Sequence, residues 1–342
     1  MTRLSIRASA GWVGVRGRID DMLVVCDGGT IAYAGPANHG PDHGGATMVD
    51  GFLMPAAADR HVHIGLADPG AVLRGGVTAV RDLGWPADAI FPLADLSEVP
   101  TFDGPLIRAV GPMLTAAGGY PSGESWAPDG TARALAGPED AASAVTELHA
   151  MGAAAIKVSL HAEAGPTPTD AELTAICDAA REVDLPVTAH LQGHGQVDRA
   201  LGAGVDELAH APSTERLPDD TIRMMARRLR IVSTLDILAR GRSTPALEIA
   251  LDNLRRFHLA GGTIVYGTDL GNGSVPPGIH GRELRLLRDV GLTLKKTLGA
   301  LIRAPLELGA PADLIAVSGD PFDDLAALER VRLLVRAGRI VA

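Results

Sequence analysis

Cysteine and aromatic residues are scarce in this 342-residue sequence, and each shortage excludes a class of protein. The two cysteines, Cys26 and Cys177, make no disulfide framework. Both lie in apolar stretches, so we expect buried, unreactive thiols. Only 3% of the residues are aromatic, which disfavours a protein that binds nucleic acid by stacking on its bases.

Basic residues are outnumbered by acidic ones, and long apolar segments are missing. The sequence has 31 lysines and arginines against 41 acidic residues, and the net charge of -10 disfavours a polyanionic partner. No apolar run is long enough to span a membrane, and residues 1–14 lack the apolar core of a signal peptide. We therefore expect a cytoplasmic enzyme or binding protein that acts on a small molecule. Neither nucleic acid nor a membrane is expected as a partner, and a homo-oligomer is left open.

The sequence does contain short apolar runs that alternate with helix-like stretches from residue 51 to about residue 307. This alternation is typical of parallel strands joined by crossover helices, and eight such runs predict a TIM-like (β/α)8 barrel over residues 53–307. The eight predicted strands occupy residues 52–59, 76–84, 105–114, 154–160, 185–190, 206–212, 230–237 and 263–271.

The two ends of the chain have a different rhythm. Residues 22–35 predict a hairpin with its turn at residues 27–29, and strand-like runs return after residue 308. We therefore predict a small β-sandwich subdomain composed of residues 1–52 and 308–342. His39 and His43 lie in a loop of this part, and we assign them no role.

Six residues able to bind metal or transfer protons lie in the predicted barrel strands or just after them, most of them at C-terminal ends, where such barrels carry their chemistry. His61 and His63 end the first strand, and their spacing places both side chains on one face. Each residue alone has a structural explanation, since strand-end histidines are commonly hydrogen-bonded and aspartates often cap the next helix. A shared metal site explains all six more economically. The six residues are His61, His63, Lys157, His190, His210 and Asp269.

Lys157 lies within the apolar run Ala-Ala-Ile-Lys-Val-Ser-Leu, where a charged ammonium is costly unless it is paired, neutral or modified. A neutral lysine can react with carbon dioxide to form a carbamate, an anion that can bridge two metal ions. The ligand set would then contain only nitrogen and oxygen donors. Such a set suits Zn²⁺, and also Mn²⁺, Co²⁺ or Fe²⁺.

The motifs DRHVHIGL, GVTAVRDLG, IKVSL, PVTAHLQGHG, AGVDELAHAP, VYGTDLGN and ADLIAVSGDPFDDL follow one another in an order that resembles the metal-dependent amidohydrolases. The closest resemblance is to the imidazolonepropionase-like and prolidase-like branch, and it covers nearly the whole chain. It implies two divalent metal ions at the barrel mouth, bridged by carboxylated Lys157 and a water or hydroxide. The resemblance implies that His61, His63 and Asp269 hold one metal and that His190 and His210 hold the other. Asp269 would also act as the general base that deprotonates the bridging water.

Two departures from the family pattern concern the region around the site. The first strand keeps Asp59 but lacks the usual glycine before it, and Tyr120 stands where relatives often carry a histidine after two glycines. Residues 113–129 predict a loop over the barrel mouth. We predict that Tyr120 hydrogen-bonds the scissile amide or a polar group near it, although it could instead only pack the loop. His194, in a glycine-flanked loop, could contact substrate or simply face solvent.

The sequence leaves the roles of several other polar residues open. Asp236, near the end of the seventh strand, and His280, after the eighth, are candidates for the pocket wall. Arg81 and Asp82 form either a structural ion pair or a substrate clamp. His161 is expected to be structural, like the histidines at positions 149 and 258.

Three functions compete at this point. The first is hydrolysis of an amide, lactam or related acyl bond by a two-metal site. The second is a mononuclear-metal deaminase on the same barrel, which is disfavoured by Lys157 at the bridging position and by the lack of a glutamate close to His190. The third is a non-catalytic relative that binds metal or ligand, which would not need Asp269.

Overall fold

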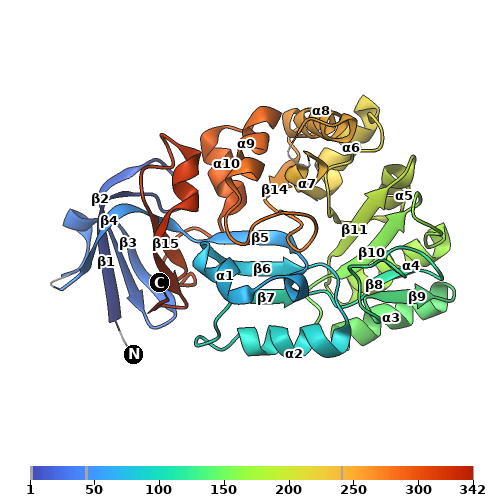
Figure 1. The fold of residues 1–342 in the computed structure, drawn as a ribbon, viewed down its shortest axis with the longest axis horizontal. Coiled ribbons are helices and arrows are strands. Elements are labelled where there is room, and N and C mark those ends of the chain that lie inside the picture. The colour runs from blue at the N-terminus through green and yellow to red at the C-terminus, as the bar shows by residue number, and fades with distance from the viewer. Residues whose placement is uncertain (1–2, 43–44, 240–241, 342) are drawn as a thin grey trace.

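The computed structural model describes residues 3–42, 45–239 and 242–341 and shows a barrel beside a sheet built from both ends of the chain (Figure 1). His43 lies outside these residues. The strands of the terminal sheet are β1 (Arg3–Gly11), β2 (Ile19–Asp27), β3 (Thr30–Pro36), β4 (Thr47–Pro55), β15 (Leu314–Val317), β16 (Val331–Arg336) and β17 (Arg339–Ile340). The remaining strands are β5 (Ala57–Val62), β6 (Val77–Asp82), β7 (Leu106–Ala109), β8 (Met113–Ala116), β9 (Ala132–Leu135), β10 (Ile156–His161), β11 (Val187–Gln192), β12 (Glu207–Leu208), β13 (Arg230–Val232) and β14 (Thr263–Val265).

The terminal sheet has seven strands in the order β17-β16-β15-β4-β1-β2-β3, so β4 and β15 join the two ends of the chain. The predicted hairpin is present, because β2 pairs with β3 across a turn at Gly28 and Gly29. The sheet curls back on itself, since Ala312 N donates to the carbonyl of Gly29 at 2.9 Å. Its inner face therefore encloses an apolar core of its own, which includes Cys26.

The barrel strands are parallel, as the alternation of runs predicts, and the barrel closes between its first and last strands. Asp269 N donates to the carbonyl of His61 at 2.8 Å, and His63 N donates to the carbonyl of Leu270 at 2.7 Å. These bonds hold the segment that follows β14 against the C-terminal end of β5. The predicted TIM-like barrel is confirmed, with the C-terminal ends of its strands gathered at one mouth.

Helices cover the outside of the barrel (Figure 1). Some of them have stabilised amino ends: Thr169 and Glu172, for example, form a reciprocal capping box at the start of α4.

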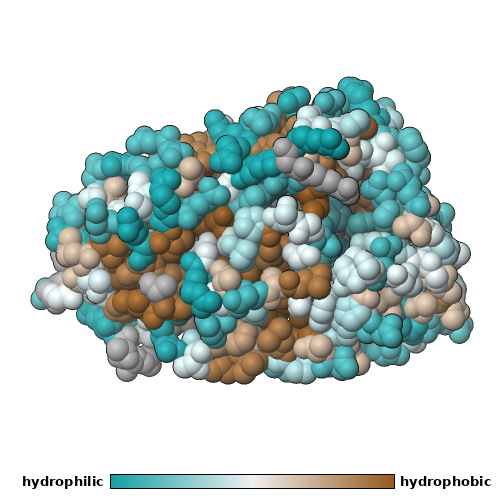
Figure 2. Space-filling model, in the orientation of Figure 1, coloured by the Kyte–Doolittle hydropathy of each residue, from teal (hydrophilic) through white to brown (hydrophobic). Residues whose placement is uncertain are grey.

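Hydrophilic residues predominate along the upper edge in Figure 2, near α8 and α9. In the described residues we find no helix with the length and apolar character needed to cross a bilayer. The helices are α1 (Pro69–Arg74), α2 (Ala87–Ser97), α3 (Pro138–Ala150), α4 (Asp170–Glu182), α5 (Gln196–Ala203), α6 (Asp219–Arg228), α7 (Leu235–Ala239), α8 (Pro245–Leu259), α9 (Gly281–Val290) and α10 (Leu294–Leu301).

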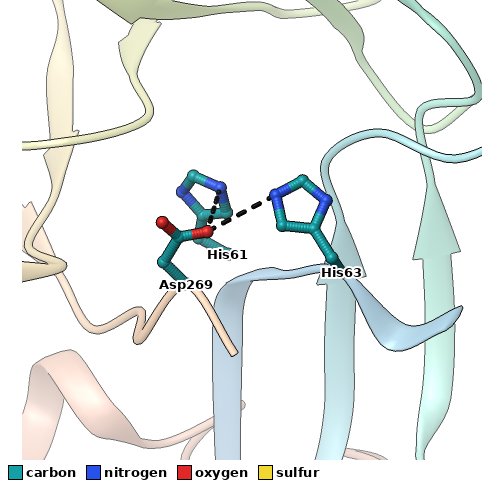
Figure 3. A group of neighbouring side chains, drawn as sticks. All are labelled: His61, His63 and Asp269. Carbon is teal, nitrogen blue, oxygen red and sulfur yellow. Dashed lines mark ion pairs between the residues drawn. The ribbon is translucent and has the colours of Figure 1, made fainter. Parts of the chain in front are cut away.

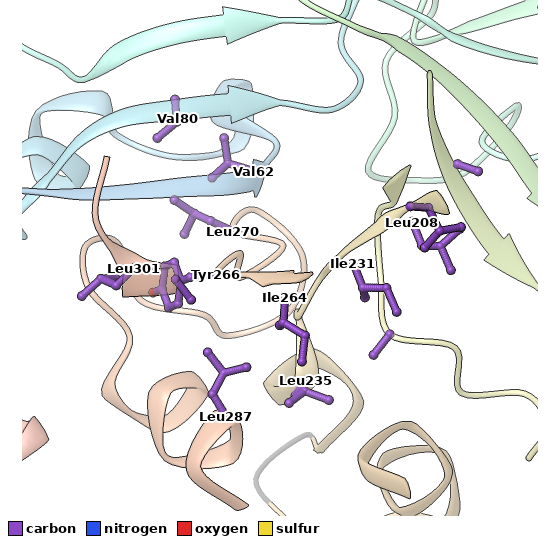
Figure 4. Packing of buried hydrophobic residues seen from close by; sticks show 14 of the residues in the cluster. Val62, Val80, Leu208, Ile231, Leu235, Ile264, Tyr266, Leu270, Leu287 and Leu301 are labelled. Atoms are coloured by element: carbon purple, nitrogen blue, oxygen red, sulfur yellow. The ribbon is translucent and has the colours of Figure 1, made fainter. Parts of the chain in front are cut away.

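The main core lies between the barrel strands and these helices. Figure 4 shows Ile264 of β14 beside Leu235 of α7, and Leu301 of α10 beside Tyr266. Cys177 of α4 belongs to the same core, and burial raises the pKa of its thiol to about 12. Burial likewise raises the pKa of Cys26 to about 11. Both cysteines are therefore the buried, unreactive thiols that the sequence predicts.

Two predicted strands differ in the structure. The third is split into β7 and β8, because Gly111 has φ of 74° and Pro112 has no N–H to donate. After this break β7 pairs with β6, whereas β8 pairs with β10 and β9. The predicted loop over residues 113–129 is thus wrong for its first four residues, which are strand. The seventh predicted strand ends at Val232, and Asp236 lies in helix α7 instead.

The barrel interior also contains a buried ion-pair network. Glu207 of β12 is fully buried and forms ion pairs with Arg81 and Arg230, while Thr188 Oγ1 donates to it at 3.0 Å. Arg81 is therefore part of this network, and it is not paired with Asp82. The Asp82 carboxylate accepts the backbone N–H groups of residues 64 and 84.

We expect Glu207→Gln to destabilise the protein by about 3–5 kcal/mol, because it leaves the buried guanidinium of Arg81 without its charge partner. Denaturant unfolding of the purified variant would measure this loss. A matched control is Asp178→Asn, which removes an exposed ion pair with Arg181 and should leave the free energy of unfolding almost unchanged. Equal losses in the two variants would contradict the importance of the buried network.

Candidate metal centre

Two histidines and one aspartate meet where the first and last strands of the barrel close. His61 is in β5, His63 follows it directly, and Asp269 follows β14. The Nε2 atoms of His61 and His63 lie 3.3 and 3.4 Å from Asp269 Oδ1 (Figure 3). All three side chains are buried, and their donor atoms lie within 4.8 Å of one another. The spacing of the two histidines therefore places both imidazoles on one carboxylate.

Hydrogen bonds on the far side of each ring fix which nitrogen carries the proton. His61 Nδ1 lies 2.8 Å from the carbonyl oxygen of Ala209, and His63 Nδ1 lies 3.1 Å from that of Gly84. A carbonyl can only accept, so in each neutral ring Nδ1 donates and Nε2 presents its lone pair. These lone pairs face the oxygen of Asp269. Three acceptor atoms that point at one another are stabilised by a shared cation.

A second pair of imidazoles lies beside the first group. His190 of β11 and His210, which follows β12, approach with Nδ1 and Nε2 3.0 Å apart. His210 Nδ1 lies 2.8 Å from the hydroxyl of Thr234, which holds its ring in place. The ring centroids of His61 and His210 are 4.5 Å apart, so the two groups are in contact. His190 Nε2 is buried and has no hydrogen-bond partner among the described residues.

Lys157 lies in β10 and is fully buried. Its Nζ has no hydrogen-bond partner in the part of the chain that the structure describes. Burial lowers the pKa of this ammonium to about 7, and the nearby Asp269 carboxylate opposes the shift. An amine that is buried, unpaired and close to neutral fits the formation of a carbamate. Together with the facing lone pairs, these donors suit divalent metal ions.

His61, His190 and His210 favour the neutral state that a metal ligand needs. Burial, helped by the charge of Lys157, holds the pKa of His61 well below its usual value. Burial also lowers the pKa of His210 to about 4 and that of His190 well below its usual value. Burial acts in the opposite direction on Asp269, but the adjacent imidazoles of His63 and His210 bring its pKa below the usual value. Neutral imidazoles and an ionised carboxylate are the metal-binding forms.

Asp59 holds the two halves of the first group together. Its carboxylate accepts hydrogen bonds from His61 N at 3.0 Å, Thr268 N at 3.1 Å and Thr268 Oγ1 at 2.5 Å. One buried side chain thus fixes β5 against the segment that carries Asp269. This role was not assigned from the sequence, although Asp59 lies two residues before His61.

An aromatic wall stands over the second group. Tyr120 stacks on His190 with the ring centroids 4.9 Å apart, and its ring lies 4.8 Å from that of His161. Trp126 lies beside His63 at 4.7 Å. Burial raises the pKa of the Tyr120 phenol, so it keeps its proton at neutral pH and can donate. His161 is the last residue of β10 and shares a strand face with Lys157, a period-two signal that sequence analysis missed.

A cavity of about 780 Å³ opens beside this centre, and both Tyr120 and Asp269 line it. Asp236 and Arg282 form part of its wall. The Asp236 carboxylate lies 2.6 Å from His280 Nε2 and 3.0 Å from Arg282 Nε, so α7 and the start of α9 are joined at the cavity. Asp236 and His280 were candidates for the pocket wall, whereas Arg282 was not recognised.

His194 is the one predicted site residue that the structure does not bring to this centre. It lies between β11 and α5, its side chain is 77% exposed, and its Nδ1 is 3.1 Å from Glu215 Oε2. It does not line the cavity beside Asp269.

Comparison with known proteins shows the family to which the chain is related. The amidohydrolase family matches residues 52–304, which is most of the chain. An uncharacterized protein of Mycobacterium tuberculosis is 27% identical over 342 residues, covering 87% of this chain and 88% of the relative. An uncharacterized protein of Mycobacterium bovis gives the same values.

Solved structures show the same fold over nearly the whole length. A candidate prolidase from Bifidobacterium longum has a TM-score of 0.84 at 27% identity and covers 99% of this chain and 94% of its own. A Xaa-Pro dipeptidase with bound methionine has a TM-score of 0.82 at 21% identity, covering 99% of each chain. These findings confirm the resemblance to the prolidase-like branch. The chain belongs to the amidohydrolase family.

Proposed function

We propose that this chain is a metal-dependent hydrolase that cleaves an amide, lactam or related acyl bond of a small molecule. The observation that carries the proposal is the convergence of two lone-pair-bearing imidazole nitrogens on Asp269 Oδ1. The buried and unpartnered amine of Lys157 supports it independently. The names of structures with this fold, among them a Xaa-Pro dipeptidase, an ochratoxinase of A. niger and a phenylurea hydrolase, are in keeping with such a reaction.

The donors would hold two divalent ions, with Zn²⁺ expected and Mn²⁺, Co²⁺ or Fe²⁺ also suited to the same nitrogen and oxygen set. Bound divalent metals lower the pKa of a water and polarise a carbonyl oxygen, and this is the chemistry they would supply here. The ligands of one ion would be His61, His63 and Asp269, those of the other His190 and His210, with carboxylated Lys157 shared between them.

Lys157 would become a ligand by a simple addition. Its neutral Nζ forms a bond to the carbon of carbon dioxide, one C–O π bond breaks, and Nζ loses a proton to water. The product is a carbamate with one negative charge. Since β10 places this group among buried residues, the carbamate would be protected from solvent.

Asp269 would act as the general base. It is ionised, and its Oδ1 already accepts a hydrogen bond from Asn272 Nδ2 at 2.9 Å, which holds the carboxylate in place. The carboxylate borders the cavity, so it can take a proton from the attacking water. The same proton can then pass to the nitrogen of the leaving group. Tyr120, a neutral phenol that lines the same cavity, would donate to the carbonyl oxygen as negative charge develops there.

Metal analysis combined with a panel of small amides, lactams and Xaa-Pro dipeptides tests the proposal. We expect up to two transition-metal ions per chain, hydrolysis of at least one compound, loss of hydrolysis on exhaustive chelation, and recovery when metal returns. Lys157→Ala should lose most activity, and a short carboxylic acid should restore part of it. The exposed Arg227→Ala in α6 is the matched control and should behave like the wild type. Full activity in a metal-free preparation would refute the proposal.

Replacing the base separates its role from metal binding. Asp269→Asn keeps an oxygen donor but cannot accept the proton, so kcat should fall by about 10²–10⁴ while much of the metal is retained. Steady-state kinetics with the metal content measured on the same sample would show this. If kcat stays near the wild-type value in a metal-loaded variant, the general base is another residue.

The phenol of Tyr120 can be tested in the same assay. Tyr120→Phe removes only the hydroxyl, and we expect kcat to fall by about 10² with little change in KM or in metal content. If Tyr120 only packs against His190 and His161, the Phe variant will keep nearly the wild-type kcat, and Tyr120→Ala will chiefly lower the melting temperature.

A further inference from the structure

A second large cavity borders β14 away from the cavity beside Asp269. It has a volume of about 700 Å³ and is lined by all three residues of this strand, Thr263 to Val265, whereas Asp269 follows the strand. The turn between α8 and β14, the start of α10 and the loop after β1 surround it, so both the barrel and the terminal subdomain contribute. The cavity is separate from the one beside Asp269 and shares no lining residue with it.

Every charged side chain that lines this cavity is basic, in a chain whose net charge is -10. Arg60 is engaged in the fold, because it donates to the carbonyls at the end of α10. Arg16, Lys295 and Lys296 have no ion-pair partner among the residues that the structure describes. The sequence contains only three lysines, one of which is Lys157 in the barrel, and the other two stand side by side here.

Two of the lining groups, one on α8 and one on α10, are close enough to interact. Burial lowers the pKa of His258, at the end of α8, and the neighbouring charge of Lys296 lowers it further. The lining residues include no aspartate or glutamate to balance the charges of Lys295 and Lys296. An anion held between α8 and α10 would balance them.

The backbone of α10 adds to the positive potential. This eight-residue helix begins after Thr293, and its amino end carries the partial positive charge of the helix dipole. Gly299 lies one turn beyond Lys295 on the same helix, and a Cβ built there would meet nothing within 4 Å. The glycine thus leaves open space directly beside the lysine.

We propose that this cavity binds a small organic phosphate. The ammonium groups of Lys295 and Lys296 suit a phosphate as compact positive charges, and a helix amino end suits the same anion. The volume exceeds that of a phosphate ion and falls in the usual range for small-molecule sites. Aliphatic lining residues, Val15, Ile264 and Leu292, provide an apolar surface for the organic part. The site does not depend on the proposed hydrolysis.

Calorimetric titration of the metal-loaded protein with ATP, ribose 5-phosphate and inorganic phosphate tests this proposal. We expect at least one of the two organic phosphates to bind more tightly than inorganic phosphate and to raise the melting temperature. Added potassium chloride should weaken the binding, because exposed charges are screened. Absence of measurable binding by both organic phosphates, or binding of inorganic phosphate alone, would overturn the assignment.

Variants distinguish this cavity from the metal centre, where a phosphate could also bind. The double variant Lys295→Ala/Lys296→Ala should raise the Kd for the organic phosphate by about tenfold or more, since two charges facing the anion are lost. Gly299→Leu should also weaken binding, by filling the open space without changing the charge. The control Arg227→Ala/Arg228→Ala removes the same charge from an exposed part of α6 and should leave the Kd unchanged. Unaltered binding in the lysine double variant, with a normal melting temperature, would place the phosphate elsewhere and refute the proposal.

Discussion

The three hydrogen bonds that Asp59 accepts are the constraint on which the centre depends. They join β5 to the segment after β14, and these are the two places from which His61 and Asp269 come. Burial raises the pKa of Asp59 to about 7, while the donors from His61 and Thr268 favour its charged form. The carboxylate is therefore costly to bury but well compensated. Together with the backbone bonds between His61 and Asp269 and between His63 and Leu270, it fixes the distance between the imidazoles and the aspartate.

Inside the barrel, the amine of Lys157 has no ion-pair partner among the described residues. Glu207 forms ion pairs with both Arg81 and Arg230. Lys157, on the neighbouring part of β10, receives no such partner, although an acidic residue there would have been the ordinary solution for a buried lysine. A conventional ion pair would hold the amine as an ammonium. Its absence among the described residues makes sense if the amine is to be converted into an anion.

The barrel and the six residues at its strands could be predicted because their signals are local: apolar runs, and polar residues where those runs end. The split of the third strand was missed, since it depends on how Gly111 and Pro112 turn the chain toward different neighbours. His161 was missed because the strand was ended one residue early. The ion pair between Asp236 and Arg282 joins α7 to α9, and no local pattern reports such a contact.

The residues that local patterns predict and the residues that depend on tertiary contacts also have different expected roles. The donors lie in or shortly after barrel strands, and structures named prolidase, ochratoxinase and phenylurea hydrolase share this fold at 19–27% identity. Tyr120, Asp236 and Arg282 of the cavity wall come instead from segments between strands. We expect these segments to influence the choice of substrate. The position of Tyr120 against His190 is where the two parts meet, because there a loop residue contacts a strand residue directly.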